Sequence, residues 1–145
     1  MAPKAQFLLS IAASAALVGT AALAAPVIEG GKRYTVNLTG AAEVPDADPD
    51  GTGTAIITVN KGQGRVCWEI SWSNIATPTA AHIHIGLEET APGGNIVLPL
   101  EPIASGCEED VRADLISALI GAPEAFYVNV HNADFPGGAI RGQLG

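Results

Sequence analysis

The sequence predicts an all-β fold, a sandwich or barrel of about seven strands with one short helix. Beyond the N-terminal apolar run, glycine, proline and aspartate interrupt the chain at intervals of about eight to twelve residues, a spacing typical of such folds. The runs between these breaks are short and rich in β-branched residues, and several alternate apolar with polar side chains. The length of 145 residues fits a single domain.

Alternation of apolar and polar residues identifies the individual strands. In residues 65–73 it puts Trp68, Ile70 and Trp72 on one face, and we expect both tryptophans in the core. Stacking of their rings on a carbohydrate is the alternative. Pro99 indicates an edge strand or a strand end. The predicted strands are residues 32–40, 54–59, 65–73, 80–86, 95–101, 125–131 and 139–145.

One segment has helical periodicity instead. Apolar residues recur at helical spacing from Val111 to Ile120, and Gly121 and Pro123 follow as stop signals. Three acidic residues, 108–110, sit where a helix N-terminus favours negative charge. We therefore predict a helix over residues 109–120.

The N-terminal segment has the composition of a secretory signal peptide. Lys4 supplies a positive charge, residues 7–23 are almost unbroken apolar and small, and residues 22–24 (Ala-Leu-Ala) fit a small-x-small cleavage site. A membrane anchor helix is the alternative interpretation. We predict a signal peptide over residues 1–25 and a mature domain over residues 26–145. The mature chain is expected to be secreted or periplasmic, and no later run in it is apolar and long enough to span a bilayer.

The charge of the chain excludes one class of partner. Fifteen acidic residues outnumber seven basic ones, and loss of Lys4 with the signal peptide makes the net charge of −8 still more negative. An acidic surface repels phosphate backbones, so we expect no nucleic-acid partner.

Two cysteines, Cys67 and Cys107, are present. In an exported protein an even pair is most simply a disulfide, although two cysteines can also be metal ligands. The predicted bridge closes a loop of about 40 residues and would stabilise the fold by roughly 4 kcal/mol through the chain entropy of the unfolded state.

The three histidines of the chain fall in two of the predicted strands. In residues 80–86, His82 and His84 share one face, while Ile83 and Ile85 share the opposite face, which we expect toward the core. The same alternation in residues 125–131 separates an inward set from an outward set; these are Phe126, Val128 and Val130 inward, and Tyr127, Asn129 and His131 outward. If the two strands are neighbours, all three imidazoles converge on one side of the sheet.

Such a cluster has two interpretations. Neutral imidazole binds copper(II) and zinc(II) well, and three histidines with an open fourth position form a known type of catalytic or exchangeable metal site. Asp134, three residues beyond His131, is a candidate fourth ligand or a carboxylate that orients a ligand. The alternative is a structural polar cluster without metal, in which the histidines bond to loop backbone or to an acid such as Glu43.

Other chemistries have no support in the motifs. The chain has no GxSxG elbow, no P-loop and no CxxC pair. No two acids are singled out by their spacing, so a two-carboxylate glycosidase is not predicted.

Four sequence blocks resemble the CHRD domain, a family named for chordin. They are LTGAAEVP, AAHIHIG, GGNIVLPL and FYVNVHNADFPGGAIRGQL, and the resemblance covers residues 34–144. It implies a β-sandwich-like extracellular module that also occurs as single exported units in bacteria. The family pattern includes the three histidines and also matches Glu43, Asn129, Gly138 and Arg141, with Arg141 expected to pair with Glu43 or Asp134. The cysteine pair is not part of that pattern.

A fainter likeness is to Cu/Zn superoxide dismutase, which also carries an HxH on a strand of a Greek-key sandwich. The three histidines of this chain are too few for the paired metals of that enzyme. The likeness therefore implies a Greek-key sandwich, immunoglobulin-like or superoxide-dismutase-like, with at most one mononuclear site.

Two functions from different classes follow. The first is a non-enzymatic exported module that binds or supports an unidentified protein or envelope component. The second is a mononuclear copper- or zinc-binding protein that uses the three histidines, with redox or hydrolytic activity as its extension. Because the first needs nothing beyond the pattern of the fold, we do not expect the chain to be an enzyme.

Overall fold

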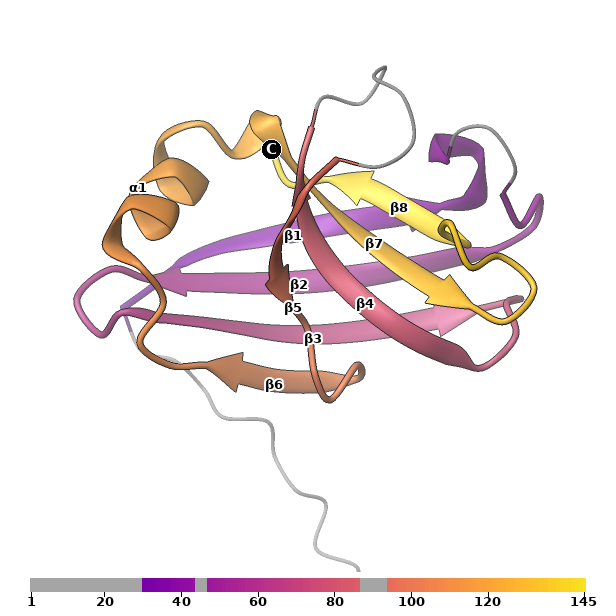
Figure 1. The fold of residues 1–145 in the computed structure, drawn as a ribbon, viewed down its shortest axis with the longest axis horizontal. Helices are drawn as coiled ribbons and strands as arrows, with labels where there is room; N and C mark the ends of the chain where they lie inside the picture. The colour runs from indigo at the N-terminus through magenta and orange to yellow at the C-terminus, as the bar shows by residue number, and fades with distance from the viewer. Residues whose placement is uncertain (1–29, 44–46, 87–93) are drawn as a thin grey trace, which may run out of the picture.

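The computed structural model describes residues 30–43, 47–86 and 94–145, and the predicted signal peptide lies outside them. These residues form eight strands, one α-helix and two short 3-10 turns (Figure 1). In chain order the elements are β1 (Lys32–Thr39), η1 (Gly40–Ala42), β2 (Thr52–Asn60), β3 (Arg65–Ser73), β4 (Pro78–Ile85), β5 (Ile96–Pro99), β6 (Ser105–Glu108), α1 (Ala113–Gly121), η2 (Pro123–Ala125), β7 (Phe126–Asn132) and β8 (Ile140–Gln143). No helix among the described residues reaches the length and hydropathy needed to cross a membrane.

The strands form one antiparallel sheet in the order β5-β4-β7-β8-β1-β2-β3-β6. The sheet curls so that β4, β7 and β8 cross in front of β1, β2 and β3 (Figure 1). In the described residues a single residue pair, Thr39 opposite Arg141, joins β1 to β8 in register. The predicted all-β class is therefore confirmed, and the two facing layers of the expected sandwich are the two halves of one continuous sheet.

The core lies between these two halves and is closed at one end by α1 (Figure 1). Ile116 and Leu119 of α1 are buried in the core, and the Tyr34 hydroxyl donates to the Leu119 carbonyl oxygen at 2.8 Å. Trp68 is buried, as expected, and its indole N–H donates to the Pro102 carbonyl oxygen. Trp72 is only partly buried, but it also packs against the core.

Two predictions of secondary structure were incomplete. Strand β6 was missed because Ser-Gly-Cys-Glu has no alternation of apolar and polar residues; it forms by pairing with β3. The helix begins at Ala113 instead of residue 109, because Asp110 has a positive φ of 54° and Arg112 an extended ψ of 134°. Of the acidic residues 108–110, Glu108 is therefore the last residue of β6, and the other two lie in the connection to the helix and not in its first turn.

Ile85 was expected in the core and is 45 % exposed, so that prediction was wrong. Its neighbour on the same face, Ile83, is fully buried as expected. Ile85 is the last residue of β4, beyond a register shift in the pairing with β5, which ends at His84 opposite Ile96. The residue therefore lies at the end of its strand, at the rim of the sheet.

The predicted disulfide is present. Cys67 of β3 and Cys107 of β6 lie opposite each other in register and are bonded, with 4.0 Å between their Cα atoms. The bridge covalently fixes the edge strand β6 to the body of the sheet, in the half that does not carry the histidines.

Candidate metal centre

The three histidines converge because β4 and β7 are neighbours. In their antiparallel register His82 lies opposite Asn129, His84 opposite Tyr127 and Ala80 opposite His131. All three imidazoles therefore project from the same face of the sheet. One ring nitrogen from each histidine lies within 4.8 Å of those of the other two. The sequence predicted that the imidazoles converge if these two strands are neighbours, and the structure shows that they are neighbours and that the imidazoles converge.

Backbone carbonyls hold two of the three rings. The Nδ1–H of His84 donates to the Gly94 carbonyl oxygen at 2.6 Å, and the Nδ1–H of His131 donates to the Pro136 carbonyl oxygen at 3.0 Å. In a neutral imidazole this leaves Nε2 with a free lone pair. Histidine ligands of metals are oriented in this way, with the second ring nitrogen donating to a carbonyl or carboxylate.

The third ring, that of His82, lies against His131. Its Nδ1 is 3.1 Å from Nε2 of His131. His131 donates its Nδ1–H to the Pro136 carbonyl oxygen, so Nε2 of the neutral His131 ring is an acceptor. The hydrogen between the two rings is therefore bound to Nδ1 of His82 in the metal-free protein. A cation bound between the rings would take the place of that proton.

The Nε2 atom of His84 is buried and has no hydrogen-bond partner. The His84 side chain is 6 % exposed, and its ring stacks on Tyr127 with 4.9 Å between ring centroids and 5° between planes. An unsatisfied buried acceptor costs about 1–3 kcal/mol. A metal ion would use this lone pair, so the residues present fit a bound cation.

The electrostatics keep the histidines neutral. Burial, followed by the charges of His131 and His84, lowers the pKa of His82 from 6.5 to about 4. Burial is also the main cause that lowers the pKa of His84 and of His131, partly opposed by their bonds to Gly94 and Pro136. At neutral pH the three rings are therefore in the form that binds metals.

Polar residues pack beside the histidines and against one another. The Asn129 amide donates from Nδ2 to Glu43 Oε1 at 2.6 Å. Gly138 has a φ of 141°, and a Cβ there would collide with the Glu43 carboxylate and with Asn129 Nδ2. Arg141 is 2 % exposed and lies over the Tyr127 ring, 4.6 Å from its centroid. The structure thus brings the four additional family-pattern positions together beside the histidines.

The structure does not bring Asp134 into this cluster. Asp134 is exposed, and its backbone N–H donates to Asn132 Oδ1 in the turn after β7. Its carboxylate is not among the atoms grouped with the three ring nitrogens. Within the described residues, the set of candidate ligands is therefore the three imidazoles alone.

Sequence reasoning placed Tyr127 and Asn129 on the same face as the histidines but did not predict that they are buried. The Gly94 and Pro136 carbonyls that hold the rings lie outside the strands. Tyr127 and Asn129 both had a sequence signal, because they alternate with His131 on the same face of the strand. No local pattern shows which loop carbonyl will lie above a sheet.

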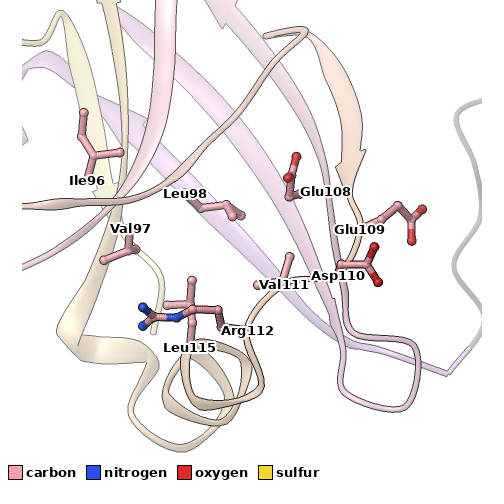
Figure 2. Close-up of a pocket in the computed structure, with 9 residues that line it drawn as sticks. All are labelled: Ile96, Val97, Leu98, Glu108, Glu109, Asp110, Val111, Arg112 and Leu115. Carbon is pink, nitrogen blue, oxygen red and sulfur yellow. The ribbon is translucent and has the colours of Figure 1, made fainter.

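A cleft lies elsewhere, between β5, the end of β6 and the start of α1 (Figure 2). Its volume is about 360 Å³, and Ile96 at its margin is 54 % exposed. Figure 2 shows the acidic side chains on one side of the cleft and the apolar side chains on the other. The lining residues are Ile96, Val97, Leu98, Glu108, Glu109, Asp110, Val111, Arg112 and Leu115.

Comparison with known proteins gives a match to a family. The family model of the CHRD domain matches residues 34–144. A search of curated proteins and a search of solved structures returned no match. The disulfide indicates an oxidising compartment, in keeping with the extracellular or periplasmic setting of such domains. The matched segment spans nearly the whole described chain, and the protein belongs to the CHRD domain family.

Proposed function

We propose that this CHRD domain binds a single transition-metal ion, copper or zinc, through His82, His84 and His131. One observation carries the proposal: a nitrogen from each ring lies within 4.8 Å of the others, although one of the histidines comes from a different strand. Metal–nitrogen bonds near 2 Å place the bound nitrogens no more than about 4 Å apart, so the three rings need only a small inward movement to hold one ion.

The alternative of a metal-free polar cluster explains the histidines less well. Such a cluster should satisfy its buried polar atoms within the protein. Here the Nε2 atom of His84 is buried without a partner, while Nδ1 of the same ring is well bonded. A lone pair that is oriented and left open is what a ligand to a cation requires.

The donor set favours copper over zinc. Nitrogen sites follow the Irving–Williams order, in which copper(II) binds more tightly than the other divalent ions of the series. Both cysteines are in the disulfide, so the site has no thiolate among the described residues. A site that selects a soft ion such as copper(I) would be expected to contain a thiolate.

We propose further that the chain is exported, with residues 1–25 acting as a signal peptide and residues 26–145 as the mature domain. The apolar N-terminal run, the disulfide and membership of the CHRD family support export. In this view metal binding takes place outside the cytoplasm, and no turnover of a substrate is assigned to the site.

The decisive test is a calorimetric titration of the oxidised mature chain with copper(II) and, separately, with zinc(II). We expect one-to-one binding in the parent and loss of that binding in His82→Ala/His84→Ala. Asp134→Asn is the matched control and should bind as the parent does, because Asp134 is outside the cluster. Absence of binding in the parent, or equal binding by the double variant, would contradict the proposal.

A second candidate function, docking of a protein partner, rests on the cleft beside α1. Ile96 is more than half exposed there and lies at the margin of an apolar wall. Exposed apolar surface of this kind marks many interaction sites. A second copy of the chain is the partner that can be tested at once, by sedimentation of the parent and of Ile96→Ser over a range of concentrations. Association that is weaker in Ile96→Ser than in the parent would support docking. A parent protein that stays monomeric at every concentration would exclude self-association through this cleft.

A further inference from the structure

We propose that Asn129 positions an exogenous fourth ligand on the metal, a small protic molecule that is water in the resting site. The ligand donates a hydrogen bond to Asn129 Oδ1. This inference rests on the proposed metal site and assigns a role that metal binding alone does not require.

Asn129 lies in the middle of the cluster. It is directly opposite His82 across the β4–β7 pair and two residues before His131 on the same face of β7. Side chains opposite each other in an antiparallel pair have Cβ atoms about 4.5–5.5 Å apart. The ring centroids of His84 and His131, on either side of this position, are 6.1 Å apart. The Asn129 amide is therefore beside the point where the three imidazoles meet.

The orientation of this amide is fixed. Its Nδ2 donates to Glu43 Oε1 at 2.6 Å, which identifies the nitrogen end of the amide. Gly138 packs directly against both groups, since a Cβ there would lie 2.6 Å from Asn129 Nδ2. The amide cannot turn over without losing the bond to the carboxylate, so Oδ1 is held as the end available to another group.

That oxygen has no partner in the protein. Asn129 is 3 % exposed, and Oδ1 is one of three buried side-chain polar atoms of the described residues without a hydrogen-bond partner. The Nε2 atom of His84 is another, and it projects from the same face of the sheet. Both atoms are acceptors, so they cannot satisfy each other.

A metal ion with a protic ligand satisfies both atoms at once. The ion accepts the lone pair of His84 Nε2, and the O–H of its bound water donates to Asn129 Oδ1. Three protein nitrogens leave a coordination position open for that water. The described residues bring no fourth His, Cys, Asp or Glu into the group to compete for the position.

The test uses the mature, oxidised chain loaded with one equivalent of copper(II). Electron paramagnetic resonance in ¹⁷O-enriched water should show line broadening in the parent, because the water oxygen is bound to the ion. Azide, which displaces water and has no proton to donate, is then titrated and followed by its charge-transfer absorption. In Asn129→Leu, which is similar in size but has no acceptor, azide should bind about two- to ten-fold more tightly, since the displaced water has lost one hydrogen bond.

Two further variants keep the test decisive. Asn37→Leu replaces an exposed asparagine of β1 and should leave azide affinity unchanged. Should Asn129→Leu not fold, Glu43→Met removes the carboxylate that holds the amide, and azide affinity should rise in the same direction by a smaller factor.

The outcomes separate this proposal from the proposed function. Failure of the parent to bind copper would overturn the metal site itself. Copper binding without ¹⁷O broadening would mean that a protein group, Asn129 Oδ1 or another, occupies the fourth position. Equal azide affinity in the parent and in Asn129→Leu would show that Asn129 does not position the fourth ligand, while the three-histidine metal site would remain supported.

Discussion

Nδ1 of His82 lies 3.1 Å from Nε2 of His131, although the two residues are 49 positions apart in the chain. The contact exists because β4 and β7 pair in a register that puts Ala80 opposite His131 and Asn129 opposite His82. The two rings lean toward each other along the diagonal between these pairs. A shift of register by one residue would send one of the rings to the other face of the sheet. The geometry of the candidate site therefore depends directly on the pairing of two strands.

Acid should destabilise the metal-free protein in a window set by the histidines. The pKa of His82 is about 4 in the folded protein against 6.5 ordinarily, and the pKa values of His84 and His131 are also lowered. Between these limits the unfolded chain binds more protons than the folded chain, so the free energy of unfolding falls as the pH falls. The contribution is complete above pH 6.5 and is lost toward pH 4.

Urea unfolding of the parent and of His82→Gln at several pH values across this window measures the effect. The variant should lose less stability on acidification, because it lacks the imidazole whose pKa is lowered to about 4. Contributions from groups that the substitution leaves unchanged cancel in the comparison. Parallel pH profiles for the two proteins would show that His82 does not contribute.

Metal should stabilise the fold, and its removal should reverse the effect. A ligand that binds only the folded state raises the free energy of unfolding by about 2.7 kcal/mol when its free concentration is 100 times its dissociation constant. Zinc(II) is the suitable probe because it has no redox chemistry. We expect a higher urea midpoint with zinc, return to the original midpoint with a chelator, and no zinc effect in His82→Ala/His84→Ala. An equal shift in that variant would place the zinc elsewhere.

Gly138 and Gly137 form a matched pair of adjacent positions. Gly138→Ala should lower the free energy of unfolding by about 1–3 kcal/mol, because its φ is 141° and the new Cβ meets Glu43 and Asn129. Gly137→Ala should change it by no more than about 0.5 kcal/mol, since nothing lies within 4 Å of a Cβ there. Thermal or urea unfolding of the two variants checks both values. Equal losses at the two positions would argue against the packing described around Asn129.

The disulfide should stabilise the fold without contributing to the site. Its sequence separation of 40 residues corresponds to roughly 4 kcal/mol of chain entropy in the unfolded state, which Cys67→Ala/Cys107→Ala would lose. Zinc affinity of the folded variant should match that of the parent, since β3 and β6 lie in the other half of the sheet. Calorimetry and urea unfolding of one preparation give both quantities. A weaker zinc affinity would indicate that the two halves are coupled.

The shared face of His82 and His84 could be predicted because side chains alternate along a strand. Their proximity to His131 could not, because alternation says nothing about which strands pair. The Gly94 and Pro136 carbonyls were beyond prediction for a related reason, since the path of a loop depends on tertiary packing. Asp134 was a candidate because it follows His131 by three residues, but closeness in sequence beyond the end of a strand does not fix where a side chain lies.

Strands could be predicted from the sequence where one face of the strand is buried and the other is exposed to solvent. Strands with an apolar and a polar face were found, but β6 was not, because pairing with β3 and a disulfide form it without any alternation. The burial of Arg141 had no signal either. A charged residue next to Ile140 in a strand suggests an outward, solvated side chain. Here Tyr127 lies beneath the guanidinium, and the chain encloses both.

The single residue pair that joins β1 to β8 makes this contact a seam between two four-stranded units. Gly142 lets the seam close, because a Cβ there would collide with the Asn37 carbonyl oxygen. One unit holds the histidines and the other the covalent bridge. The slowly exchanging amide hydrogens should accordingly fall into two cooperative groups. Metal binding should slow exchange further in the unit with the histidines, and formation of the disulfide should slow it in the other unit. Arg141 supplies one half of the pair at the seam and lies over the Tyr127 ring, which stacks on His84, so it connects the seam directly to the histidine cluster.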